Sequence, residues 1–327
     1  MQEPFINIKD IVDGSDLEKL KLLAEIIQKG KCIAFIGSGL SKAESYRDWE
    51  EVIKGKNGLI DFVFENQNLY LIDVEKKLID LVEDCKNHNF DRYKEFILNE
   101  FGRKFAPFVY HPNHQQIWKI PFHSVFTTNF DPCLYDAGRS LDVLTQVFSY
   151  PYFPIPPQKS SLNHLHGLAF YTGDDDIDLI DTIIFSKSEY ANAYKGPNNY
   201  LKDLLFFSMT KYTIFFSGFS LKDPFILDLF KDINQNINYR AELVKLKLKE
   251  NIILPSHFIL FPEGEPDEEL LADLNALNIN VISYKPINTN YVGLDYILQY
   301  LSTGKSESFV KMPSIKGSIK SGENNES

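Results

Sequence analysis

The sequence predicts an α/β protein in which helices cover both faces of a parallel sheet. Short apolar runs of strand length, such as residues 32–36 and 213–217, are each followed by glycine or by polar residues. Between these runs lie segments that repeat apolar residues at three- and four-residue spacing, as amphipathic helices do. Strands that alternate with helices in this way build parallel sheets that are covered on both sides.

In the first part of the chain, the helical pattern of residues 17–30 ends at Gly30 and is followed by the strand CIAFIG. A new helix is expected after Gly39 and Ser41, continuing through DWEEVIKG. Residues 59–118 repeat apolar positions at helical spacing and are expected to be mostly helical.

From about residue 122 the pattern changes to short strands and helices in alternation. A helix that starts at a proline is expected in DPFILDLFKDI, because proline is favoured in the first helical turn. The expected strands lie in HSVFTTNFD, LDVLTQVFS, LNHLHG, DTIIFS, KYTIFFSG, HFILF and NVISY. The other expected helices are EYANAY, which SKSE opens, LKDLLFFSMT, DEELLADLNALN and LDYILQYLS.

These elements predict one domain over residues 1–302. The helical segment at about 45–120 is expected to be an insertion between the first two strands of the sheet. Residues 303–327 are rich in Ser, Gly, Lys and Asn and poor in core-forming residues, so a flexible tail is expected there.

Composition limits the classes of function. The chain has 327 residues, is 44% hydrophobic and carries a net charge of −11, which argues against a broad nucleic-acid-binding face but leaves a local basic groove open. It contains neither a signal-peptide core nor an apolar run of membrane-spanning length, so a cytoplasmic protein without a membrane partner is expected. The three cysteines, Cys32, Cys85 and Cys133, form no CxxC pair, which excludes a zinc ribbon and disfavours disulfides.

The stretch KCIAFIGSGLSK carries the first candidate binding motif. A buried strand, then Gly37, Ser38 and Gly39, then a helix would place backbone amides at a helix N-terminus, where a pyrophosphate binds well. The alternative is a tight strand-to-helix turn without a ligand. No Gly-Lys-Ser/Thr follows, so this is not a Walker loop, and Lys42 stands where the third glycine of GxGxxG would fall.

Three other strand ends are unusually polar: residues 127–131 (TTNFD), 164–167 (HLHG) and 217–224 (SGFSLKDP). Ligands of doubly wound sheets bind in the crevice beyond the carboxyl ends of the strands. These three segments are therefore expected to meet the Gly37 loop around one ligand.

Taken in order, the segments GSGLS, HQQIWKIPFHSVFTTNFD, LHG and FSGFSLKDP resemble the sirtuin-like NAD-binding domains of bacterial anti-phage systems. The resemblance runs from about residue 17 to 302 and includes IIFSKSEY and the closing NVISY and LDYILQYL. It implies a Rossmann-like sheet with a helical insertion. It also implies an NAD-consuming activity that becomes harmful to the cell once infection triggers it.

The resemblance assigns catalytic roles to Asn129 and His166. NAD already carries a cationic leaving group, so its cleavage does not need a strong acid. It needs a site that binds the ribose, shields an oxocarbenium-like transition state from solvent and positions the attacking water. The amide of Asn129 both donates and accepts hydrogen bonds, although it would serve equally to cap the turn. Histidine side chains ordinarily change charge near neutral pH, and His166 matches the family's catalytic histidine before glycine. His164 is its competitor, because two residues apart on a strand share a face.

The remaining candidate residues would bind NAD. Ser38 and Ser41 are expected at phosphate or ribose, and Asp131 at a ribose hydroxyl or in support of its loop. In the family, the loop that corresponds to FSGFSLKDP borders the adenine ribose, although Asp223 would equally serve as an N-cap before Pro224. The binding set comprises Gly37, Ser38, Gly39, Ser41, Thr128, Asp131, Gly218, Ser220 and Asp223.

The resemblance thus predicts a hydrolase that cleaves NAD to nicotinamide and ADP-ribose in abortive-infection defence. Protein-deacylating sirtuins carry a four-cysteine zinc module that three cysteines cannot build, so no metal is expected and deacylation is disfavoured. The alternatives are a sensor or scaffold that binds NAD or ADP-ribose without cleaving it, and an NAD-dependent deacylase or ADP-ribosyltransferase. The expected partners are a second copy of the chain and a protein that senses infection, such as a nucleic-acid motor or an Argonaute-like protein.

Overall fold

The computed structural model describes residues 7–44, 46–47, 49–65, 73, 76–102, 110–169, 182–196, 199–219, 224–249, 253–287 and 292–303. Its centre is a seven-stranded sheet of order β3-β4-β2-β1-β5-β6-β7, in which every pair of neighbouring strands is parallel. This confirms the predicted α/β class. The strands are β1 (Cys32–Ile36), β2 (Val125–Thr127), β3 (Gln146–Ser149), β4 (Ser161–His164), β5 (Thr213–Ser217), β6 (His257–Pro262) and β7 (Ile279–Tyr284).

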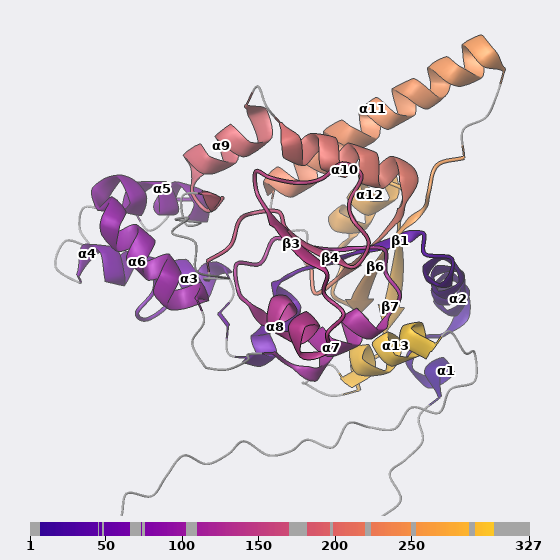
Figure 1. Ribbon diagram of the computed structural model, residues 1–327, viewed down its shortest axis with the longest axis horizontal. Coiled ribbons are helices and arrows are strands. Elements are labelled where there is room, and N and C mark those ends of the chain that lie inside the picture. Colours follow the sequence, from indigo (N-terminus) through magenta and orange to yellow (C-terminus); the bar gives the residue numbers. More distant parts are fainter. Residues whose placement is uncertain are drawn as a thin grey trace, which may run out of the picture.

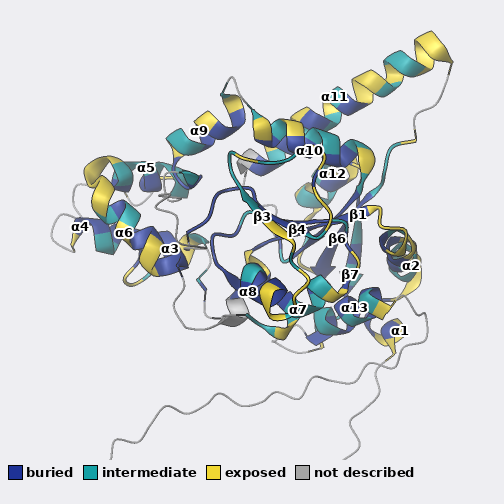
Figure 2. Cartoon of the chain, viewed as in Figure 1, coloured by how far each residue is buried: buried dark blue, intermediate teal, exposed yellow. Residues whose placement is uncertain are grey.

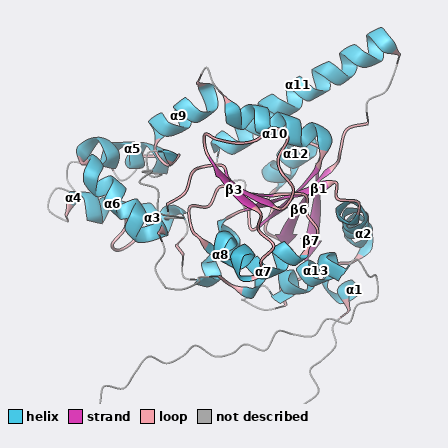
Figure 3. Cartoon of the chain, in the orientation of Figure 1, coloured by secondary structure: helices cyan, strands magenta, loops and turns pink. Residues whose placement is uncertain are grey.

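Helices cover both faces of the sheet (Figures 1 and 3). Side chains alternate along β1, so Ala34 and Ile36 pack into one helical layer while Ile33 and Phe35 pack into the other. The first layer contains α1 (Ile8–Ile11), α2 (Gly14–Gln28), α7 (Pro112–Lys119), α8 (Cys133–Ser140) and α13 (Val292–Thr303). The second contains α9 (Lys187–Lys195), α10 (Tyr200–Lys211), α11 (Pro224–Leu248) and α12 (Glu268–Ala276).

A third group of helices lies to one side of the sheet, at the left of Figure 1. We call it the helical block; it comprises α3 (Trp49–Lys54), α4 (Leu59–Phe64), α5 (Leu78–His88) and α6 (Phe90–Phe101). Its own apolar core also takes in Phe130 and Phe185, so the block packs against segments that follow β2 and precede α9. The domain limits remain a prediction, and residues 304–327 lie outside the described residues.

Most of the expected strands and helices are present, with three differences. The segment after β1 is a short 3-10 helix, η1 (Ser38–Glu44), and α3 starts separately at Trp49, so the single helix expected through DWEEVIKG is wrong. DTIIFS contains no strand among its described residues. Its apolar side chains are buried instead in a loop, where Ile184 donates one backbone bond to His166.

The third difference is α11, which extends to Leu248, well beyond DPFILDLFKDI. Its far end projects from the body and is largely exposed (Figure 2). Among the helices that the structure describes, none combines the length and the apolar composition that crossing a membrane requires.

Candidate active site

The carboxyl ends of the four central strands finish level with one another. Ile36 of β1 pairs in register with Thr127 of β2 and with Ser217 of β5, and Thr127 pairs with His164 of β4. The segments after these residues therefore meet at one edge of the sheet, as the sequence predicts. We call this the carboxyl edge.

The glycines after β1 pack against the loop after β5. A Cβ atom at Gly37 would lie 2.3 Å from the Gly218 carbonyl oxygen, and one at Gly39 would lie 2.9 Å from the same oxygen. Gly39 N–H donates to the Gly218 carbonyl at 2.8 Å, and Gly218 itself has a φ of +64°. The packing of the protein itself thus explains why Gly37 and Gly39 are glycines: the two loops cross so closely that a side chain at either position would collide with the other backbone.

Asn129 lies two residues beyond the end of β2 and is only 7% exposed. Its backbone N–H donates to the Thr127 hydroxyl at 3.0 Å, which fixes the turn after the strand. Its side-chain amide donates to the Ser41 hydroxyl at 3.3 Å. The amide therefore faces the Gly37 loop rather than bulk solvent.

Ser41 connects several buried polar groups. His114 of α7 accepts the His111 N–H at Nδ1, so its proton is on Nε2, which lies 3.5 Å from the Ser41 hydroxyl. The Ser41 oxygen thus receives donors from both His114 and Asn129. Its own proton is then available to the Asp131 carboxyl, whose pKa the Ser41 hydroxyl lowers.

Asp131 and His114 are buried, and burial opposes the charged form of each. Burial raises the pKa of Asp131 above its ordinary value, against hydrogen bonds from Cys133 and Ser41 that lower it. Burial lowers the pKa of His114 to about 3, with its neighbour His111 acting in the same direction. His114 is therefore a neutral donor at physiological pH.

The two histidines of HLHG have different surroundings. β4 ends at His164, so His166 lies in the following turn and the expectation of a shared strand face is wrong. His164 is fully buried and its Nδ1 donates to the Asn129 carbonyl at 3.0 Å. Burial lowers the pKa of His164 to about 4, so it is a neutral support for the Asn129 turn.

His166 is held by aromatic residues of α9. Its Nε2 lies 2.6 Å from the Tyr194 hydroxyl, and its ring meets the Tyr190 ring edge-on at 5.2 Å. The ring of Phe130 lies 6.4 Å from that of His166. The residue next to Asn129 is therefore beside His166, and the two candidate catalytic groups belong to one region.

The structure brings most of the predicted binding residues to this edge. Ser38 and Gly39 are exposed, and Thr128 and Gly218 are partly exposed, which leaves them open to a ligand. Ser41, Asn129 and Asp131 form the buried network behind them. Ser220 and Asp223 lie outside the described residues.

Sequence reasoning missed two residues of the site, His114 and Tyr194. The signal for His114 was HPNH, a proline-initiated helix start in which His111 and His114 form a reciprocal cap. The signal for Tyr194 was the Tyr190–Tyr194 spacing in EYANAY, which puts both rings on one side of a helix. Neither signal indicates which loop the side chain would contact.

A cavity of about 120 Å³ lies elsewhere, at the amino ends of the strands near His257 and Met209. It is separate from the carboxyl edge. Within the described ranges, no group of three or more His, Cys, Asp or Glu side chains is arranged to hold a metal ion, and the three cysteines are free and buried.

Residues 123–282 match the model of the SIR2-like domain family. The NAD(+) hydrolase ThsA of Enterococcus faecium is 24% identical over 281 residues, which is 80% of this chain and 54% of that protein. The NAD(+) hydrolase ThsA of Bacillus cereus (strain MSX-D12) is 24% identical over 293 residues, 84% of this chain and 54% of that protein.

The chain thus spans about half the length of these curated relatives. Among solved structures, a Sir2 homolog–NAD complex aligns with a TM-score of 0.41 and 10% identity, covering 86% of this chain and 94% of that one. The matched family segment contains both Asn129 and His166. Residues 123–282 of this chain are thus similar to SIR2-like domains.

Proposed function

We propose that this protein hydrolyses NAD to nicotinamide and ADP-ribose, with Asn129 and His166 as its catalytic residues. The observation that carries the proposal is the buried polar network at the carboxyl edge, where Asn129 is fixed by Ser41 and His164. Relatives named NAD(+) hydrolase ThsA, which match most of this chain, support the same reaction.

In the proposed reaction the bond between ribose C1′ and the nicotinamide nitrogen breaks, and its electron pair neutralises the pyridinium. Water then adds to C1′ and releases one proton. Asn129 would hold the nicotinamide ribose and the incoming water, because its amide is immobilised by the Ser41 hydroxyl and the backbone bond to Thr127.

His166 would accept the proton from a ribose hydroxyl or from water. It is 3% exposed, so a bound ribose at this edge would complete a site that is already shielded from bulk solvent. The exposed residues Ser38 and Gly39 and the partly exposed Thr128 would face the rest of the dinucleotide.

The proposal includes a role in anti-phage defence and activation through a partner protein or through self-association, as the family resemblance implies. Activity that rises with protein concentration, or on addition of the products of neighbouring genes, would support such activation. Full activity in a dilute monomer that no added protein increases would contradict it.

The test is product analysis with purified protein and NAD, alone and with those added proteins. Equal amounts of nicotinamide and ADP-ribose are expected, without dependence on an acceptor. O-acyl-ADP-ribose formed from an acylated peptide would indicate a deacylase instead, and ADP-ribose attached to protein would indicate a transferase. Binding of NAD without cleavage under any condition would indicate a sensor.

A further inference from the structure

Helix α9 connects the helical block to His166. Tyr190 and Tyr194 on this helix contact the imidazole, while the first turn of the helix is bonded to α5 and α6 of the block. Tyr194 lies five residues beyond Glu189, which is about 7.5 Å along a helix axis. A displacement of the first turn would therefore carry the Tyr194 hydroxyl with it.

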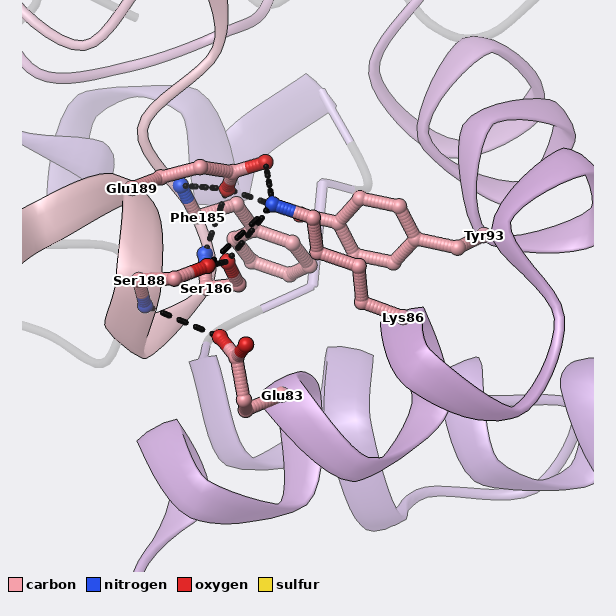
Figure 4. A network of polar contacts seen from close by, with 7 residues as sticks. All are labelled: Glu83, Lys86, Tyr93, Phe185, Ser186, Ser188 and Glu189. Carbon is pink, nitrogen blue, oxygen red and sulfur yellow. Dashed lines mark hydrogen bonds and ion pairs between the residues drawn. The ribbon is translucent and has the colours of Figure 1, made fainter.

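Glu189 is the centre of the contact between α9 and the block (Figure 4). Its carboxylate forms an ion pair with Lys86 of α5 at 2.7 Å and accepts a hydrogen bond from the Tyr93 hydroxyl of α6 at 3.0 Å. It also accepts the N–H groups of Phe185 and Ser186 at 2.9 and 2.7 Å. Both charged side chains are about one-fifth exposed, so the pair is better shielded from solvent than a surface ion pair.

Lys86 and Glu83 form further hydrogen bonds with the start of α9. Lys86 also reaches the Ser186 hydroxyl at 3.2 Å and the Ser188 hydroxyl at 3.4 Å. Glu83 accepts the Ser188 N–H at 2.9 Å. The start of α9 is therefore attached to α5 by the side chains of Glu83 and Lys86, and to α6 by that of Tyr93. We call these three residues together with Glu189 the α9 clamp.

An aromatic contact joins the block to the other catalytic loop. The ring of Phe185, directly before α9, meets the ring of Trp49 at 4.7 Å and that of Phe130 at 5.7 Å, both nearly perpendicular. Phe130 separates Asn129 from Asp131 in the sequence. The block thus contacts the residue directly before α9, and that residue contacts the loop that carries Asn129.

We infer that Lys86 and Glu189 are positioning residues, which orient His166 through α9 and Tyr194. The helical block acts through this clamp on the hydrogen bond between the Tyr194 hydroxyl and His166 Nε2. The inference rests on the proposed function for its kinetic consequence, because the imidazole must be oriented toward a ribose hydroxyl or a water.

The test compares four variants of the full chain. Lys86→Met removes the cation and keeps most of the side-chain length, and Lys86→Arg restores the charge. Tyr194→Phe removes the hydroxyl that contacts His166. Lys187→Met is the matched control, because Lys187 is on the same helix and pairs with Asp80 of α5, yet its side chain is 60% exposed.

The first readout is the pair of His166 ring-nitrogen signals in NMR spectra, assigned by their loss in His166→Gln. We expect Tyr194→Phe and Lys86→Met to move these signals in the same direction. We expect Lys86→Arg to return them toward the parent positions and Lys187→Met to leave them unchanged. Parent positions in Lys86→Met, with an unchanged melting temperature, would overturn the inference.

The second readout is the kinetics of NAD cleavage. Lys86→Met should lower kcat about tenfold while KM stays within about twofold, since orientation of a base affects the chemical step rather than binding. Raised KM with unchanged kcat would contradict a positioning role. If the parent protein cleaves no NAD under any of the conditions given for the proposed function, that function fails, and the ring-nitrogen signals still decide whether the block orients His166.

Discussion

At the amino edge of the sheet, His257 lies at the start of β6 and accepts the Ile214 N–H of the neighbouring strand at 3.1 Å. At the carboxyl edge, His164 lies at the end of β4 and donates to the carbonyl of Asn129. Both histidines are buried, and burial lowers the pKa of each to about 4.

The two edges differ in what the buried polar groups hold. His257 bonds to the backbone of the adjacent strand and so supports the sheet itself. The carboxyl-edge groups join loops that are far apart in the sequence, since Asn129 contacts Ser41 across 88 positions and Ser41 contacts His114 across 73. Polar burial at the amino edge serves stability, whereas at the carboxyl edge it also immobilises groups suited to react with a ligand.

The two histidines at the edges should differ strongly in their effect on catalysis. His166→Ala should reduce NAD cleavage about 100-fold or more, because a general base typically contributes that much. His257→Gln, at the amino edge, should leave the turnover of folded protein unchanged. Turnover measured against the folded fraction checks this, and equal losses in both variants would remove the distinction.

Gly37→Ala should destabilise the carboxyl edge by about 3 kcal/mol, at the upper end of what overpacking costs. The added methyl would lie 2.3 Å from the Gly218 carbonyl oxygen, and backbone cannot yield as a flexible side chain does. Denaturant unfolding measures the change. Gly264→Ala is the control for a second glycine, because a Cβ there meets no atom within 4 Å and only its φ of +83° is strained. A Gly37→Ala protein as stable as the parent would show that the loops do not cross as described.

His164→Ala should lower the free energy of unfolding by about 2 kcal/mol, because the Asn129 carbonyl would lose its buried donor. Its effect on turnover should be smaller than that of His166→Ala, since His164 acts through the backbone of Asn129. Parallel kinetics and unfolding curves test this. Equal catalytic losses at the two histidines, without a change in stability, would reverse their roles.

Lowering the pH should gradually reduce the free energy of unfolding, because three buried histidines are neutral in the folded protein. Burial lowers the pKa of His114 from 6.5 to about 3, and it lowers the pKa of both His164 and His257 from 6.5 to about 4. Below pH 6.5 these histidines are therefore protonated in the unfolded chain but remain neutral in the folded chain. Each histidine should then cost about 1.4 kcal/mol per pH unit as pH falls toward those values. The raised pKa of Asp131 acts in the opposite direction and offsets part of the loss.

Urea midpoints measured between about pH 7.5 and about pH 5 test this expectation. They should be level above about pH 6.5 and decrease below it. A midpoint that does not change across this range would contradict the neutral state of these histidines.

Much of the carboxyl edge was predictable from sequence, because parallel strands end at a common edge and polar motifs follow three of them. The apolar runs 32–36 and 213–217 became β1 and β5 for the same reason: each is short, apolar and followed by glycine. The contact between Gly37 and Gly218 was not predictable, because it depends on β1 and β5 being neighbours across 180 residues of chain.

The errors have local causes. DTIIFS has the apolar composition of a strand, yet Ile183 and Phe185 pack between the helical block and the TNFD loop, while Ile184 packs into the second helical layer. The segment after Gly39 has helical spacing, but η1 ends at Glu44 and α3 begins only at Trp49. Tertiary packing accounts for the DTIIFS loop, because the helices and the loop that its side chains contact are distant in the sequence.

The most direct measurement is nicotinamide release from NAD by the parent protein, Asn129→Ala and Asn275→Ala, under the condition in which the parent is active. Asn275 lines the cavity at the amino edge, so its variant makes the same chemical change at the other edge of the sheet. We expect Asn129→Ala to lose about 1,000-fold or more in rate with its fold retained, and Asn275→Ala to match the parent. Undiminished cleavage by Asn129→Ala would contradict a catalytic site at the carboxyl edge.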